Sequence, residues 1–213
     1  MRLCVSAVLL LLLALTRAAP GPGSEECSKF SILKDKTQIL GRTYMLVAFT
    51  DNNLSRNAFG LISSLWSTIT ETQTGFSVAQ FNKMNGTCKE SRFNMTTSGD
   101  TAKVVMFGMK SECQLLNFSS TSMIMDFRAT TNNIATFIEK FHLDPNINHG
   151  PSDTSQILKA HDLFLISKEP DLNEMDLQRF RAHAKCKGFT GEPDFLRNSR
   201  EEYCTEEESA PIH

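Results

Sequence analysis

The chain has 213 residues, with 22 Lys and Arg, 24 Asp and Glu, and a formal net charge of −2 at neutral pH. A mildly acidic chain is not built to neutralise phosphates, which argues against nucleic acid as a partner. The length fits one domain with tails, large enough to bury a hydrophobic core.

The chain begins with the features of a secretory signal peptide. Met1-Arg2 supplies a basic start, an almost unbroken apolar run follows from Val5, and small residues come next, with cleavage expected after Ala18. Neither this run nor any later one reaches the length of about 20 apolar residues that a membrane span needs. The sequence therefore predicts a signal peptide over residues 1–18 and a secreted, extracellular protein without stable membrane insertion.

The middle of the chain has the pattern of a run of short strands separated by turn residues such as Asn85-Gly86. Strands of this length at regular spacing predict an antiparallel meander that closes as a sandwich or a barrel. The expected strands are Ile39–Thr50, Leu61–Thr70, Gly75–Lys83, Lys89–Thr97, Ala102–Met109, Cys113–Phe118, Ser122–Arg128 and, after a longer interval, Ala160–Ser167.

The interval before the last strand contains the first expected helix. Ile134, Phe137, Ile138 and Phe141 recur at helical spacing and form one apolar stripe over two turns. A polar loop with Pro and Gly follows at residues 144–155, and we expect it to act as a hinge.

A second helix is expected near the C-terminus. Asp171 can cap it, and Leu177, Phe180 and Ala184 fall on one face. It is expected to end in a Lys-Cys-Lys-Gly sequence, which carries typical stop signals. The Glu-rich residues 201–213 are expected to form a solvated acidic tail.

Local motifs occur in a recognisable order along the chain. Gly41 lies on the first expected strand, Leu177-x-x-Phe180 lies on the second helix, and Cys186 follows six residues later. With the sequence around Cys88, this order resembles the alpha-1-acid glycoprotein branch of the lipocalin family. It is also similar to fish relatives of that branch, among them the pufferfish saxitoxin- and tetrodotoxin-binding proteins.

The resemblance implies an eight-stranded antiparallel up-and-down barrel over residues 19–200 with a C-terminal helix, and the apolar stripe of this chain adds an extra helix in the last interstrand loop. A barrel of this size can hold one small ligand. The resemblance therefore implies a carrier whose partner is a small hydrophobic or amphiphilic molecule.

The chain departs from the family pattern in two places. The family signature Gly-x-Trp is replaced by Gly41-Arg42-Thr43, and the single tryptophan, Trp66, belongs to the second expected strand. The barrel floor is therefore expected to be sealed in another way. The insertion at residues 129–159 falls at the open mouth of a lipocalin barrel, where its helix would form a lid.

The sequence carries no catalytic motif, since GxSxG, HExxH and a phosphate-binding glycine loop are all missing. Its five histidines are scattered without metal-ligand spacing. We therefore expect a protein that is not an enzyme and that uses no cofactor or metal.

Two alternatives to a carrier stay open. One is an enzyme that uses a cysteine in the cavity, for which Cys113 is the natural candidate, although it begins its expected strand and has no evident activating partner. The other is an immune or inhibitory protein that acts through its loops.

The expected cavity residues come from two arguments. By resemblance to the pocket positions of the branch, Met45, Val105, Phe164 and Ile166 are expected to bind the ligand. On the last strand, Asp162 shares a face with Phe164 and Ile166. If this face points inward, a carboxylate lies in an apolar cavity and favours a cationic or hydroxyl-bearing ligand. The alternative places Asp162 at the rim, in water.

Five cysteines remain outside the signal peptide, which leaves one thiol over or one intermolecular bridge. Spacing alone does not choose among the possible pairings, and Cys88 and Cys113 could pair with each other. We predict Cys27–Cys186 and Cys88–Cys204 with Cys113 free. The first bridge would tie the N-terminal arm to the helix end, and the second would tie the tail to the barrel.

Four Asn-x-Ser/Thr triplets, at Asn53, Asn85, Asn94 and Asn117, are candidate glycosylation sites in a secreted chain. Asn53 and Asn85 lie in expected loops. Asn94 and Asn117 lie in expected strands, where a glycan requires a side chain that points outward.

Overall fold

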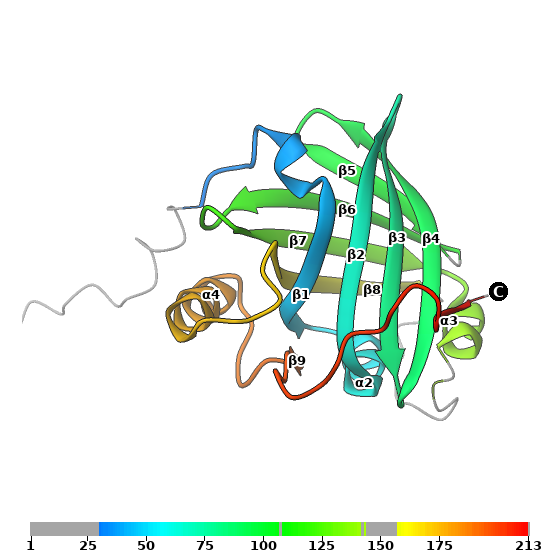
Figure 1. The fold of residues 1–213 in the computed structure, drawn as a ribbon. Coiled ribbons are helices and arrows are strands. Elements are labelled where there is room, and N and C mark those ends of the chain that lie inside the picture. The colour runs from blue at the N-terminus through cyan, green and yellow to red at the C-terminus, as the bar shows by residue number, and fades with distance from the viewer. Residues whose placement is uncertain (1–29, 107, 142, 144–156, 213) are drawn as a thin grey trace, which may run out of the picture.

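The computed structural model describes residues 30–106, 108–141, 143 and 157–212, which form the predicted closed antiparallel barrel (Figure 1). Each of eight strands pairs with the next one along the chain, and β1 also pairs with β8, which closes the barrel. The strands are β1 (Gly41–Thr50), β2 (Ile62–Thr72), β3 (Gly75–Met84), β4 (Thr87–Ser98), β5 (Thr101–Met106), β6 (Met109–Asn117), β7 (Ser122–Thr131) and β8 (Leu158–Ser167).

The alternation of side chains along these strands separates the barrel lumen from the outer wall. In β8, Asp162, Phe164 and Ile166 line the lumen. Leu163 and Leu165 lie on the opposite face and are nevertheless fully buried. Both faces of this strand are covered, because a helix packs on the outer wall here.

That helix is α4 (Glu174–Cys186), which covers the outer faces of β1, β6, β7 and β8. Leu177, Phe180 and Ala184 form its buried face, as predicted. The N-cap is Asn173, whose Oδ1 accepts a hydrogen bond of 2.8 Å from the backbone N–H of the third helical residue. The prediction of Asp171 as the cap was wrong, because only the residue directly before the first helical turn can reach these N–H groups.

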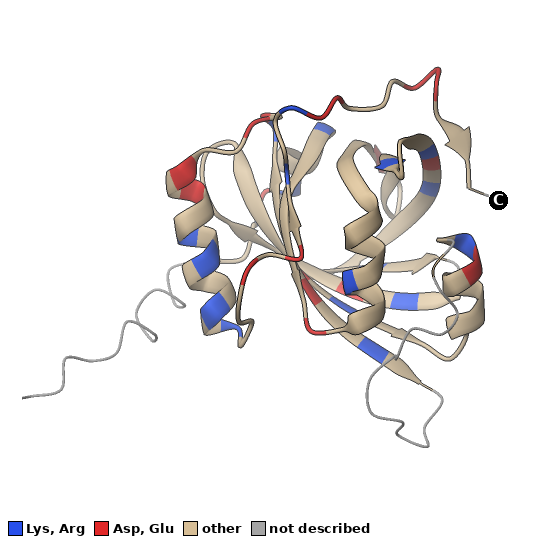
Figure 2. Cartoon of the chain, turned by 90° about the horizontal axis from the view of Figure 1, so that it is seen from below, with Lys and Arg blue, Asp and Glu red and all other residues tan. Residues whose placement is uncertain are grey.

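Two further helices lie at one end of the barrel, which Figure 2 views directly. In the β7–β8 connection, α3 (Ile134–Lys140) confirms the extra helix predicted in the last interstrand loop. In the β1–β2 connection, α2 (Asn53–Leu61) replaces the expected turn and the expected start of β2. Its N-cap, Asn52, accepts hydrogen bonds from the backbone N–H groups of Leu54 and Ser55 at 2.8 and 3.3 Å.

The opposite end of the barrel is closed by the segment that precedes β1. The 3-10 helix η2 (Lys36–Ile39) lies at this end, and Leu33 and Ile39 pack against Ile69 and Phe76 inside the barrel (Figure 1). These apolar contacts seal the floor that the missing Gly-x-Trp tryptophan would otherwise fill.

Trp66 lies outside the lumen, under the C-terminal segment. Its ring stacks on Phe81 with 4.3 Å between ring centroids, and its Nε1–H donates to the carbonyl oxygen of Cys204 at 2.8 Å. The predicted Cys88–Cys204 disulfide is confirmed and holds this segment against the barrel. The single tryptophan of the chain is therefore a reporter for the attachment of the C-terminal segment.

The rest of the C-terminal segment is also attached to the barrel. β9 (Phe195–Leu196) pairs with β1, and β10 (Ala210–Pro211) pairs in parallel with β4. Residues 205–208 are exposed. Both residues of β10 are exposed as well, although the backbone of this segment hydrogen-bonds to β4. The acidic tail expected at residues 201–213 is therefore held against the barrel at Cys204 and at β10.

The other cysteines agree with the prediction as far as the structure describes them. Cys186 is disulfide-bonded, whereas its predicted partner Cys27 and the predicted signal peptide lie outside the described residues. Cys113 is free, as predicted, and the structure shows that it is also buried. In the described part of the chain, no helix is both long enough and apolar enough to cross a membrane.

Candidate functional site

A cavity of about 210 Å³ lies inside the barrel, beneath α2 and α3. All eight strands and both helices contribute to its wall, which is mainly apolar. A smaller cavity of about 40 Å³ continues toward the closed end, and residues such as Ile69, Met95 and Ile166 line both. The lumen is thus a pocket that narrows toward the floor and is roofed by two helices.

Methionine and phenylalanine dominate the cavity wall. Methionine fills irregular space and repacks around ligands of different shape, and phenylalanine supplies large apolar surface. The methionines are Met45, Met95, Met106, Met109 and Met125, and the phenylalanines are Phe59, Phe93, Phe127, Phe137, Phe141 and Phe164.

Of the five predicted ligand-binding residues, Met45, Asp162, Phe164 and Ile166 line the cavity. Val105 does not, because its side chain is 67% exposed on the outer wall. Its neighbours Val104 and Met106 line the cavity instead. The position assigned by resemblance is therefore wrong by one residue. In a strand, a shift of one residue moves the side chain to the other face of the sheet. That the four lumenal residues bind a ligand stays a prediction.

The roof of the cavity is a contact between α2 and α3. Leu54 and Ala58 of α2 pack against Phe137 of α3. The Phe137 and Phe141 rings stack with 4.5 Å between centroids, and both rings also line the cavity. The predicted apolar stripe therefore covers the mouth of the barrel and not its outer wall. The predicted hinge at residues 144–155 lies outside the described residues.

Among the described residues that line this cavity, Asp162 is the only one with a carboxyl group. The residue is only 5% exposed, and its Oδ1 has no hydrogen-bond partner among the described residues. Burial raises the pKa of this carboxyl to about 7, and the hydroxyl groups of Thr50 and Ser55 oppose that rise. The alternative that placed Asp162 at the rim in water is therefore wrong.

Asn82 is a second polar group in the cavity wall, and the sequence analysis missed it. It lies on β3, is 1% exposed, and its Nδ2 has no hydrogen-bond partner among the described residues. Its Oδ1 accepts a hydrogen bond of 3.0 Å from Nε2 of Gln80, which also lines the cavity. The signal in the sequence is that Val78, Gln80 and Asn82 alternate, so that an apolar inward face turns polar near the mouth.

Cys113 also lines the cavity, but in a state that does not favour catalysis. It lies in the middle of β6 and not at the start of a strand, as the sequence analysis placed it. Burial raises the pKa of its thiol to about 11, so that the thiol is protonated at neutral pH and is a weak nucleophile. The described wall of the larger cavity contains no His or Lys that could act as its base.

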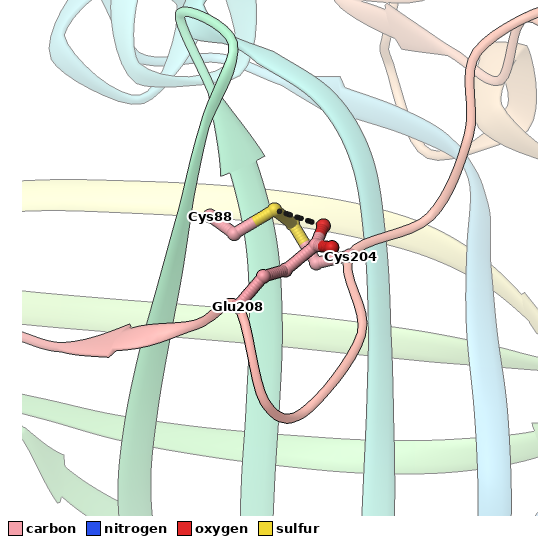
Figure 3. Close-up of side chains that lie close together, drawn as sticks. All are labelled: Cys88, Cys204 and Glu208. Carbon is pink, nitrogen blue, oxygen red and sulfur yellow. Dashed lines mark hydrogen bonds between the residues drawn. A yellow bond between two sulfur atoms is a disulfide. The ribbon is translucent and has the colours of Figure 1, made fainter.

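One cluster in the described residues brings three metal-ligand side chains together, but it does not form a metal site. Cys88, Cys204 and Glu208 meet where the C-terminal segment crosses the barrel (Figure 3). The two sulfur atoms are joined in a disulfide and have no thiolate to offer. The Glu208 carboxylate lies 3.0 Å from Sγ of Cys88, which is a sulfur–oxygen contact because a disulfide sulfur carries no hydrogen.

The four candidate glycosylation sites are all exposed. Asn85 lies in the β3–β4 turn, whereas Asn53 is the first residue of α2 and not part of a loop. Asn94 and Asn117 point outward from their strands. Nδ2 of Asn117 donates to Oγ of Ser31 at 3.1 Å, and a glycan on this nitrogen would compete with that bond. Glycosylation stays a prediction at all four.

Comparison with known proteins gives structural matches only. No protein-family model and no curated protein sequence matches the chain. Lipocalin 12 from rat epididymis is 11% identical and aligns over 91% of this chain and 99% of its own, with a TM-score of 0.60. The siderocalin Ex-FABP is 10% identical and aligns over 76% of this chain and 95% of its own, with a TM-score of 0.54.

Identities this low carry information about the fold alone. This chain forms a closed eight-stranded antiparallel barrel followed by a helix on its outer wall, and this architecture is what the structural matches support. The chain therefore has the lipocalin fold.

Proposed function

We propose that this protein is a secreted carrier that holds a small lipophilic or amphiphilic molecule inside the barrel. The observation that carries the proposal is the apolar cavity between a sealed floor and a helical roof. A core that served stability alone would be packed without such a space. Apolar pockets with a few placed polar groups are the usual form of small-molecule sites.

The dimensions of the cavity favour a small ligand. Its volume of about 210 Å³ is below the range of roughly 300–1,000 Å³ that is common for drug-sized molecules. Five methionines in the wall can change rotamer without loss of packing. A slender ligand fits the existing space, and a larger one requires movement of the methionines or of the roof.

Several features support secretion and a place in the alpha-1-acid glycoprotein branch. The Cys88–Cys204 disulfide requires an oxidising compartment, in agreement with the predicted signal peptide and the exposed glycosylation triplets. The motif that resembles the branch and its pufferfish relatives includes Leu177 and Phe180, which lie on α4 and are buried against the outer wall of the barrel. Cys186, the third residue of that motif, is disulfide-bonded.

A carrier agrees better with the cavity than a cysteine enzyme does. Catalysis by Cys113 would require a thiolate, and burial raises the pKa of this thiol to about 11. No His, Lys or Arg side chain lines the larger cavity among the described residues. The chemistry of the wall is that of binding.

The proposal is tested with the neutral fluorophore N-phenyl-1-naphthylamine and a matched pair of variants. We expect saturable fluorescence enhancement with about one site per chain. Val104→Trp fills the cavity and should abolish most of the binding, whereas Val105→Trp adds the same group on the outer wall and should leave binding unchanged. Absence of saturable binding, or an equal loss in both variants, would contradict a lumenal site.

A further inference from the structure

Two residues that line the cavity each have a buried side-chain atom without a hydrogen-bond partner among the described residues: Oδ1 of Asp162 and Nδ2 of Asn82. Most buried polar atoms in proteins have a partner, and each exception requires a physical explanation. The two residues are 5% and 1% exposed, so that bulk solvent does not satisfy them. Their presence in one cavity points to a ligand that completes them.

Both residues lie near the mouth of the barrel. Asp162 is opposite Thr50, the last residue of β1, and Asn82 is two residues from the end of β3. The wall below them, toward the floor, is formed by side chains such as Ile69, Met95 and Ile166. The cavity therefore has a polar end beneath the roof and an apolar end at the floor, which fits an amphiphile whose apolar part is inserted first.

The charge of the wall selects among polar head groups. Among the described residues, Asp162 is the only carboxyl group in the wall of the larger cavity, which contains no Lys, Arg or His, whereas Lys36 and Asp100 border the smaller cavity at the floor. The charged or titratable neighbours that affect its carboxyl group are Asp51, which disfavours its ionisation, and His161, which favours it. An anionic head group would meet a carboxylate without any compensating cation, whereas a cationic head group supplies the missing partner.

The desolvation of Asp162 has already taken place in the folded protein, so that binding adds only the desolvation of the ligand. The raised pKa of this carboxyl, about 7, agrees with a buried acid that lacks a counter-ion. An ammonium group offers three N–H donors, enough for Oδ1 of Asp162 and for a neighbouring hydroxyl such as that of Ser55.

We infer that the cavity takes a small amphiphilic amine, whose cationic nitrogen binds Asp162 beneath the roof while its apolar part extends toward the floor. Asn82 offers its N–H group, on the same polar end, to an oxygen of the ligand where one is present. The inference rests on the proposed carrier function and specifies the chemical class of the ligand.

The test uses three probes with the same eight-carbon chain: octylamine, octanol and octanoate, each titrated by calorimetry at pH 8. We expect octylamine to bind about ten-fold or more tightly than octanol, the range of a hydrogen bond to a charged group, and octanoate to bind weakest. In Asp162→Asn the preference for octylamine should disappear while octanol binding is retained. The matched control Glu139→Gln removes an exposed charge of α3 that does not line this cavity, and it should keep the preference.

The outcomes separate this inference from the carrier function itself. If octanol and N-phenyl-1-naphthylamine bind but octylamine has no advantage, the amine assignment is overturned and the carrier function stands. The same holds if Asp162→Asn leaves the preference intact, or if Glu139→Gln abolishes it equally. If none of the probes binds to the wild-type protein, both proposals fail. Octanol binding by Asp162→Asn serves as the check that this variant is folded.

Discussion

If α3 is a lid, then weakening its contact with α2 should open the cavity without unfolding the barrel. The change that tests this is Phe137→Ser. Phe137 is buried between the two helices and also lines the cavity. A buried phenylalanine removes about 150 Å² from water, which corresponds to about 4 kcal/mol at ~25 cal/mol/Å².

Only part of this free energy is lost when the lid opens, because the Phe137 ring also stacks on Phe141 of the same segment. We take about half, or about 2 kcal/mol, which corresponds to an increase of about 30-fold in the population of the open state. The thermal midpoint should change little, since the strands and α4 keep their contacts.

Cys113 supplies an internal assay for this opening, because its thiol is free and lies in the cavity wall beneath the roof. Its rate of alkylation by iodoacetamide, followed by intact mass at a fixed alkaline pH, should rise by about 30-fold in Phe137→Ser. Ala135→Ser, at an exposed position of the same helix, should leave the rate unchanged. A large loss of stability with an unchanged alkylation rate would show that the stripe belongs to the core and would refute the lid.

Three further predictions concern other parts of the molecule. Burial raises the pKa of Asp162 to about 7, so that the carboxyl group is ionised above that pH. The affinity for octylamine should therefore fall by about ten-fold per pH unit below 7. The affinity for octanol should not change over the same pH range. Burial lowers the pKa of His183 to about 4 from about 6.5 in the unfolded chain, so that its stabilising neutral state is complete above pH 6.5 and is lost as the pH falls toward 4. The urea midpoint of the wild type should therefore fall relative to that of His183→Gln between these pH values. Replacing both Cys88 and Cys204 with Ser should release the segment that covers Trp66. Tryptophan emission should then shift to the red, and acrylamide should quench it more strongly. An unchanged spectrum would mean that packing alone holds the segment.

The fold could be predicted from the sequence because the strands and turns alternate at regular spacing. The same alternation placed Asp162, Phe164 and Ile166 on one face of β8 without showing that this face points inward. Val105 was assigned to the wrong face because Val104, Val105 and Met106 are all apolar. A strand with apolar residues on both faces does not reveal its inward side.

The features that the sequence analysis missed depend on tertiary contacts. Helix α2 contains Asn57 and Gly60, which are poor helix formers, and its contact with α3 through Leu54 and Ala58 stabilises it. Asn82 is distinguished by its amide nitrogen Nδ2, which has no hydrogen-bond partner among the described residues, and no linear pattern can show this.

The central claim, that the lumen of the barrel is the ligand site, is tested most directly by protection of Cys113. Its alkylation rate is measured in the wild-type protein with increasing N-phenyl-1-naphthylamine, alongside the fluorescence titration. A lumenal ligand covers this thiol, so that the rate should fall in proportion to occupancy and approach zero at saturation. Saturable fluorescence with an unchanged alkylation rate would place the ligand outside the barrel and contradict the account.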